Sequence, residues 1–216
     1  MKKLLVLLLL PGFLQAQTPT PCDLLIKNGK IIDGSGNSWY RGNLVINHGK
    51  IVSIFRSAAI SNEENKWQPT RIIDAQDKMV APGFIDVHTH IEGDEKKDPE
   101  AKSFIYDGVT TCITGNCGLS QVDVNRYYNF IDSLRMSINV TMLIGHNDIR
   151  RAVMGRANRD ATDQEQVEME QLVEKAMRDG AVGLSTGLIY IPGTFSKTPE
   201  IIGLAKKAAA FGGVYA

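Results

Sequence analysis

The sequence is poor in cysteine, has no excess of charge of either sign, and lacks a long apolar run. Its 24 basic residues balance 24 acidic residues. This balance argues against nucleic acid as a partner and against an acidic tail. The longest apolar run, Leu4 to Leu10, is far shorter than the ~20 residues that a membrane span needs. With 43% hydrophobic and 22% charged residues, the composition is that of a globular protein with a core.

The N-terminus has the layout of a secretory signal peptide. The basic pair Lys2-Lys3 precedes the apolar run, and Pro11-Gly12 interrupts it before the small residue Ala16. We expect residues 1–16 to be removed on export, which leaves a periplasmic or secreted protein without membrane attachment. The alternative is that the run forms a buried strand or helix of the fold.

The three cysteines are an odd number for an exported protein, so at least one of them is not in a disulfide. Cys112 lies within a predicted strand, where we expect it to pack in the core. Cys117 follows that strand in the segment Gly115-Asn116-Cys117-Gly118, in which the glycines allow close backbone approach. It is either a thiolate ligand for a metal or a small buried hydrophobe.

Residues 17–80 read as a small β-rich domain, interpreted below as a β-sandwich segment. Asn28-Gly29 predicts a tight hairpin between Leu24–Lys27 and Lys30–Ile32. Three further features complete the pattern: a second hairpin around Gly49 that joins Leu44–Ile46 to Ile51–Ile54, a polar loop from Ser61 to Thr70, and a strand at Arg71–Asp74 before a turn at Ala75–Lys78.

From Pro82 onward, strand and helix patterns alternate, which predicts a parallel sheet covered by helices. The expected strands are Phe84–Val87, Thr110–Thr114, Asn139–Ile144 and Val182–Leu188; the expected helices are Val124–Leu134, Asp163–Asp179 and one with Thr198 as N-cap that ends near Gly212. About four such units occur, whereas a closed (β/α)₈ barrel has eight. We therefore favour a truncated chain over a smaller open α/β sheet.

The most informative segment is Ala81–His90, in which a short apolar run ends in His88-Thr89-His90. Side chains two residues apart on a strand project from the same face. The two imidazoles should therefore point together at the end of a buried strand and form half of a site for a divalent metal. The alternative is a pair of histidines that are merely exposed or hydrogen-bonded at a strand end.

Two other histidines are weaker candidates. His146 follows an apolar strand and is a ligand, a substrate contact or a structural residue. His48 lies in a predicted hairpin turn, where we expect no chemical role.

Several motifs together resemble the amidohydrolase superfamily and, within it, the N-acyl-D-amino-acid deacylases (the D-aminoacylase family). The resemblance covers nearly all of the chain after the signal peptide. It rests on Leu25–Gly29 with Asp33-Gly34, Ala81–His90, Gly108–Thr111, Gly115–Gly118, Gly145-His146 with Arg150, and Gly183–Tyr190.

The resemblance implies an α/β fold: a partial TIM-like (β/α)₈ barrel in residues 81–216, preceded by the β-sandwich segment in residues 17–80. It implies that His88, His90 and Cys117 are ligands for one or two Zn²⁺ ions, with the thiolate shared between the two positions. Tyr190 aligns with a tyrosine that contacts the substrate; the alternative is a packing residue at the barrel rim. We take His146 as a second candidate substrate contact. The family's two later histidine ligands and its catalytic aspartate would lie beyond residue 216.

The resulting functional prediction is hydrolysis of the amide bond of a small N-acyl-D-amino acid, with selectivity for the D-form implied by the resemblance alone. A cyclic-amide hydrolase of the dihydroorotase or hydantoinase kind is an alternative. Some binuclear metallohydrolases bridge their two metals with a carboxylated lysine on the fourth strand. The corresponding segment here, Ala181 to Tyr190, contains no lysine, which argues against the cyclic-amide alternative. An inactive fragment or a metal-binding module remains as a third interpretation.

Overall fold

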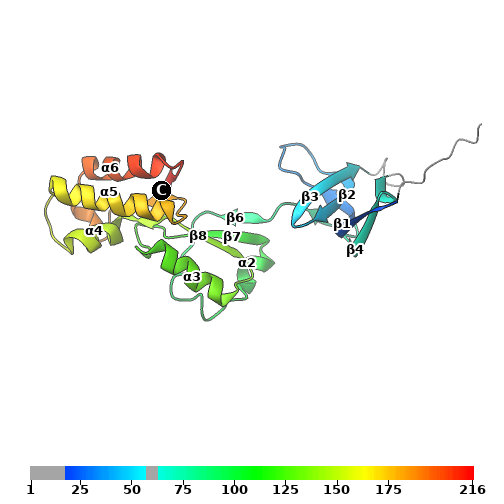
Figure 1. Ribbon diagram of the computed structural model, residues 1–216, viewed down its shortest axis with the longest axis horizontal. Helices are drawn as coiled ribbons and strands as arrows, with labels where there is room; N and C mark the ends of the chain where they lie inside the picture. Colours follow the sequence, from blue (N-terminus) through cyan, green and yellow to red (C-terminus); the bar gives the residue numbers. More distant parts are fainter. Residues whose placement is uncertain (1–17, 57–62) are drawn as a thin grey trace, which may run out of the picture. The chain divides into compact units, whose positions relative to one another are not determined.

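The computed structural model describes residues 18–56 and 63–216 (Figure 1). It divides into two compact units, one ending at Pro82 and the other starting at Gly83. The predicted signal peptide, residues 1–16, lies outside the described residues. Among those residues, no helix combines the length and the apolar character that crossing a bilayer requires.

The first unit is one five-stranded sheet with the order β3-β2-β1-β4, in which β5 also pairs with β1. Its core contains the buried residues Cys22, Leu25, Val45 and Phe55, against which Trp67 packs. The strands are β1 (Thr20–Ile31), β2 (Tyr40–Asn47), β3 (Lys50–Arg56), β4 (Trp67–Asp74) and β5 (Met79–Val80). The antiparallel hairpin around Gly49 is confirmed, and His48 lies in its turn.

The prediction of a hairpin at Asn28-Gly29 is wrong. Strand β1 runs through these residues, and its register with β2 shifts between Ile26 and Gly29. Asn28 adopts a left-handed φ of 57°, and its backbone N–H donates to Asn43 Oδ1 at 3.0 Å. An Asn-Gly pair supplies the left-handed residue that a tight turn needs, but a β-bulge uses the same conformation.

The prediction of a polar loop from Ser61 to Thr70 is also wrong in part. Part of it lies outside the described residues, but β4 begins at Trp67, which pairs with Thr20 of β1. The parallel partner strand supplies backbone hydrogen bonds that the polar composition of this segment did not reveal.

The second unit is a mixed α/β fold with two three-stranded parallel sheets, ordered β6-β7-β8 and β11-β10-β9. The expected strand Asn139–Ile144 is split at Leu143, so that its two halves belong to different sheets. The strands are β6 (Phe84–Asp86), β7 (Val109–Thr114), β8 (Asn139–Met142), β9 (Ile144–Gly145), β10 (Gly183–Ser185) and β11 (Val214–Tyr215).

The helices of this unit are α2 (Lys102–Tyr106), α3 (Val124–Leu134), α4 (His146–Met154), α5 (Asp163–Arg178) and α6 (Thr198–Ala209), with a short 3₁₀ turn, η2, at Gly193–Phe195. Helices α3, α5 and α6 lie close to the predicted positions, whereas the sequence did not predict α2 and α4. Thr198 is the first helical residue of α6 rather than its N-cap, which is Lys197. Pro199 therefore occupies the second position, where its missing N–H costs no intrahelical bond.

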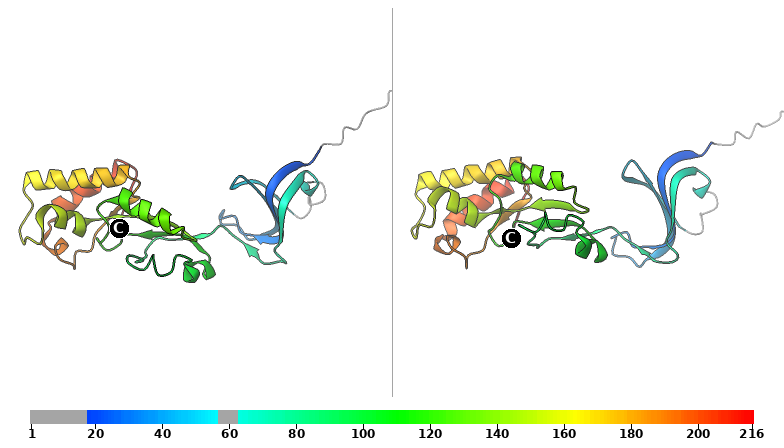
Figure 2. Two further views of the ribbon diagram at one scale, coloured as in Figure 1. Left: turned by 60° about the horizontal axis from the view of Figure 1, so that its bottom comes forward. Right: turned by 90° about the horizontal axis from the view of Figure 1, so that it is seen from below.

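The core of the second unit lies between its strands and helices, and α5 and α6 run side by side in it (Figure 2). Helix α5 buries Met169, Val173, Ala176 and Met177, a spacing that places all four on one helical face. Cys112 is fully buried with Ile91, Ala101 and Ile138, as expected of a packing residue.

Strand β6 is exposed rather than buried as predicted. Phe84, Ile85 and Val87 are each at least 60% exposed. Strand β6 is at the edge of its sheet and pairs only with β7 among the described strands, and none of its side chains belongs to a core cluster of the described residues. An apolar run predicts a strand but does not reveal whether both of its faces are covered.

The N-terminus of α5 carries a testable contribution to stability. Thr162 Oγ1 accepts from the Glu165 backbone N–H, and the Glu165 carboxylate accepts from the Thr162 N–H, which together form a capping box. We expect Thr162→Ala to lower the free energy of unfolding by about 1 kcal/mol. Urea denaturation followed by circular dichroism would measure this change. An unchanged midpoint would contradict the role of the cap.

Candidate metal centre

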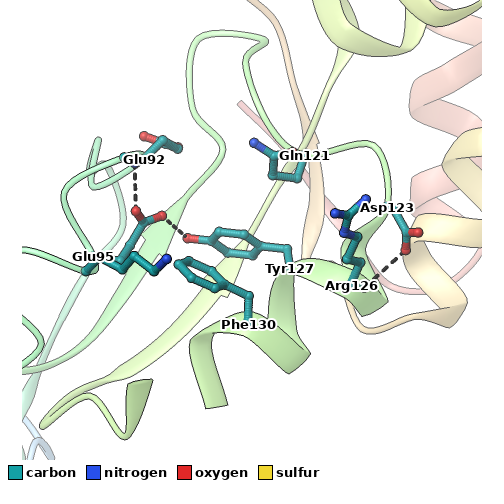
Figure 3. Close-up of a pocket in the computed structure, with 9 residues that line it drawn as sticks. Glu92, Glu95, Gln121, Asp123, Arg126, Tyr127 and Phe130 are labelled. Carbon is teal, nitrogen blue, oxygen red and sulfur yellow. Dashed lines mark hydrogen bonds between the residues drawn. The ribbon is translucent and has the colours of Figure 1, made fainter. Parts of the chain in front are cut away.

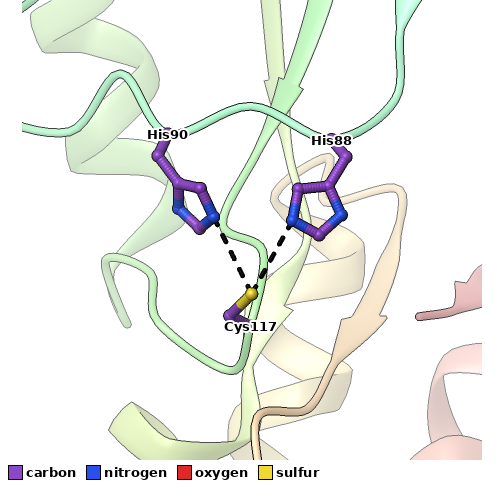
Figure 4. A group of neighbouring side chains, drawn as sticks. All are labelled: His88, His90 and Cys117. Atoms are coloured by element: carbon purple, nitrogen blue, oxygen red, sulfur yellow. Dashed lines mark hydrogen bonds between the residues drawn. The ribbon is translucent and has the colours of Figure 1, made fainter.

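The structure brings His88, His90 and Cys117 together at one point (Figure 4). The Cys117 Sγ lies 3.7 Å from His88 Nε2 and 3.7 Å from His90 Nε2. One ligand atom from each of the three residues lies within 4.8 Å of the other two. Within the described part of the chain, no other group of three or more such side chains converges in this way.

The two imidazoles lie on the segment after β6, which bends at Val87 and His88. His88 and His90 are exposed, whereas Thr89 between them is buried. Thr89 donates to the Ile113 carbonyl from its backbone N–H at 3.1 Å and from its hydroxyl at 2.9 Å. These bonds hold the segment against β7 and leave the exposed rings of His88 and His90 to meet Cys117.

Cys117 reaches the histidines from a tight loop after β7. Its own φ is 55°, and Gly115 and Gly118 also have positive φ. A Cβ on Gly115 would lie 2.1 Å from the Leu143 carbonyl oxygen, so that position has no room for a side chain. A left-handed conformation costs a residue with a Cβ roughly 1–2 kcal/mol. The surrounding structure must therefore hold Cys117 in place.

Glu92 connects the histidine segment (His88–His90) to the cysteine loop (Gly115–Gly118), and the sequence did not predict this role. One carboxylate oxygen accepts from the Gly115 N–H at 2.8 Å and from the Thr114 hydroxyl. The other lies 3.9 Å from His90 Nδ1. Histidines that bind a metal through one nitrogen commonly face a carboxylate with the other. The available signal was spacing, since Glu92 stands two residues after His90.

The donor set fits zinc. Two imidazole nitrogens and a thiolate are ligands that Zn²⁺ takes, and three protein ligands leave a position open. Tetrahedral geometry with ordinary Zn–N and Zn–S bonds separates nitrogen and sulfur by roughly 3.6 Å. The observed separations of 3.7 Å are close to that value.

His146 lies elsewhere, buried in a charged cluster. Its Nε2 is 2.8 Å from Glu200 Oε1, and the fully buried Arg150 binds the other oxygen of Glu200. Burial acts to raise the pKa of Glu200, but hydrogen bonds from His146 and Arg150 outweigh it and hold that pKa below its usual range. The His146 ring thus contacts Glu200 through Nε2. The substrate contact of His146 stays a prediction.

Tyr190 lies in the loop after β10 and is about half exposed. Its backbone N–H donates to the Gly187 carbonyl at 2.9 Å. Gly187 in turn lies against the cysteine loop, since a Cβ there would be 2.0 Å from the Cys117 carbonyl oxygen and 2.9 Å from Tyr190 Cδ2. The structure therefore brings Tyr190 into the same loop cluster as Cys117. Its substrate contact remains a prediction.

Beside Glu92 is a pocket of about 530 Å³ that sequence reasoning also missed (Figure 3). The Tyr127 hydroxyl donates to Glu95 Oε1 at 3.0 Å, and burial together with the Glu95 charge raises the pKa of Tyr127. Figure 3 shows the Tyr127 and Phe130 rings lying next to each other at the base of this group. The other side chains around the pocket are Lys96, Gln121, Asp123 and Arg126.

Comparison with known proteins places this chain in a family. The chain is 35% identical to a D-aminoacylase of Alcaligenes xylosoxydans xylosoxydans, over 91% of this chain and 44% of that protein. It is 34% identical to an N-acyl-D-aspartate deacylase of the same organism, over 85% of this chain and 40% of that protein. The chain thus spans less than half the length of these curated relatives.

A solved structure resembles the chain closely. The N-acyl-D-glutamate deacylase of Bordetella bronchiseptica, complexed with zinc and a phosphonate inhibitor, superimposes with a TM-score of 0.81 at 33% identity, covering 91% of this chain and 44% of that one. In addition, residues 71–210, which are more than half of the chain, match the model of the amidohydrolase family. The chain belongs to the amidohydrolase family.

Proposed function

We propose that the protein hydrolyses the amide bond of N-acyl-D-amino acids in a zinc-dependent reaction. The observation that carries this proposal is the convergence of His88, His90 and Cys117. Support also comes from the relatives, which are a D-aminoacylase and deacylases of N-acyl-D-aspartate and N-acyl-D-glutamate. The substrate class is therefore a small N-acylated amino acid.

In this proposal His88, His90 and Cys117 hold one or two zinc ions through Nε2, Nε2 and Sγ. When bound, zinc supplies Lewis acidity for a carbonyl and lowers the pKa of a coordinated water. Glu92 orients the His90 ring through Nδ1, and Tyr190 contacts the substrate at the rim. The aspartate that moves the proton, and two further histidine ligands, are proposed to lie beyond residue 216.

The organisation of the whole protein is part of the same proposal. Residues 17–80 would contribute to a β-sandwich, and residues 81–216 would form the first half of a (β/α)₈ barrel. Residues 1–16 would direct export to the periplasm or the medium. The five-stranded sheet of the first unit and the parallel strands of the second support this organisation.

A substrate panel with metal removal tests the function. We expect the purified protein to release the free amino acid from N-acetyl-D-amino acids but not from their L-enantiomers. Chelation should abolish this activity and added Zn²⁺ should restore it, since the three ligands serve only to hold the metal. Ring opening of a dihydropyrimidine or hydantoin instead would favour the cyclic-amide alternative. Zinc binding without any hydrolysis would indicate a metal-binding module.

A further inference from the structure

Two fully buried polar side chains, Ser185 and Asn147, form hydrogen bonds with the cysteine loop, and neither belongs to the metal centre. Ser185, at the end of β10, is bound to both sides of Cys117. Its hydroxyl donates to the Gly115 carbonyl and accepts from the Gly118 N–H at 3.0 Å. One side chain thus fixes the two peptide groups that flank Asn116-Cys117.

Asn147, near the start of α4, holds the middle of the same loop. Its Nδ2 donates to the Cys117 carbonyl at 3.4 Å and to the Gly187 carbonyl at 3.2 Å. Its Oδ1 accepts from the Gly193 N–H at 2.6 Å, which ties the side chain to the loop before α6. The Asn147 backbone N–H also donates to the Gly118 carbonyl, at 2.9 Å.

These contacts matter because Cys117 does not hold its conformation unaided. A residue with a Cβ prefers negative φ, and a change from 55° to that region would turn the Cα–Cβ bond, and with it Sγ, away from the histidines. The loop has no regular secondary structure of its own. Its direction is set by residues 30 and about 70 positions away in the sequence.

We propose that Ser185 and Asn147 are positioning residues that aim the Cys117 sulfur at His88 and His90 and so set the affinity of the metal centre. This inference rests on the proposed function, because it requires that the three side chains bind zinc. Outer residues that orient metal ligands typically change metal affinity by about 10- to 100-fold when they are removed. A purely structural role would instead lower stability and leave affinity unchanged.

The test compares Ser185→Ala and Asn147→Ala with a matched control, Tyr128→Phe. The Tyr128 hydroxyl also has three partners in the second unit, namely Thr141 Oγ1, the Gly180 carbonyl and the Met142 N–H, but none in the cysteine loop. Zinc affinity would be measured by competition with a chelator. Cobalt substitution would report the sulfur–metal bond through its charge-transfer absorption. Circular dichroism and urea denaturation would report folding.

We expect both alanine variants to bind Zn²⁺ about 10- to 100-fold more weakly and to lose cobalt–sulfur absorption. Tyr128→Phe should lose stability but keep affinity and absorption. Ser185→Thr, which retains the hydroxyl, should recover most of the affinity. If Ser185→Ala does not fold, Asn147→Ala decides the question alone.

Two results would overturn the inference in distinguishable ways. A wild-type protein that binds neither zinc nor cobalt would reject the proposed function and this inference together. A wild-type protein that binds both metals, beside folded alanine variants with the same affinity and absorption, would reject the positioning role alone.

Discussion

Replacing Cys117 with alanine should remove bound zinc and hydrolysis together. The variant loses the only sulfur among the three converging donors and leaves two imidazoles, which lie on one short segment. Loss of a direct ligand should exceed the about 10- to 100-fold weakening that outer residues produce. Metal analysis after dialysis and initial rates on an N-acetyl-D-amino acid would measure both effects.

Cys112→Ala is the matched control for this experiment. Cys112 is also a free cysteine of the second unit, but it is fully buried and its burial raises the pKa of its thiol. Its loss should cost stability without removing metal, because its thiol is not among the converging donor atoms. Full activity and unchanged zinc content in Cys117→Ala would reject the ligand role.

Replacing Glu200 with leucine should destabilise the second unit by about 3–5 kcal/mol, because it leaves a buried charge without its partner. Arg150 is fully buried, and Glu200 is its carboxylate partner. The free energy of unfolding in urea would measure this loss. Glu174→Gln is the control: its partner Arg178 lies on the exposed face of α5, where little change is expected.

The same cluster predicts how stability depends on pH. The folded pKa of Glu200 lies below the ordinary value of 4.5 that it regains on unfolding. Its contribution is therefore complete above pH 4.5 and is lost as the pH falls through the lower folded pKa. Urea denaturation at stepwise lower pH should show this loss in the wild type. Glu200→Gln, which cannot ionise, should lack that component; an identical acid profile would contradict the assignment.

Short-range patterns in the sequence predicted much of the fold. Helix α3 begins and ends where expected, and α5 begins at the expected Asp163, because both features depend on residues within a few positions of each other. The convergence of His88 and His90 was predicted from their two-residue spacing, but β6 ends at Asp86 and the hydrogen bonds of Thr89 to Ile113 hold the segment in place.

The remaining features depend on partners that are distant in sequence. The bulge at Asn28 depends on Asn43 and on the pairing of β1 with β2. The contact of His146 with Glu200 joins residues 54 positions apart, and that of Ser185 with Gly115 joins residues 70 apart. No local pattern encodes such pairs, so the buried charged cluster and the support of the cysteine loop became visible only in three dimensions.

Glycine residues around Cys117 allow backbone segments to approach closely, which limits the substitutions that this turn tolerates. Gly115 and Gly187 each touch a neighbouring carbonyl oxygen with no room for one added methyl group. Even a substitution to alanine at Gly115 or Gly187 would therefore force the backbone around Cys117 to move. Substitutions are accommodated more easily in the neighbouring solvent-facing residues 188–191.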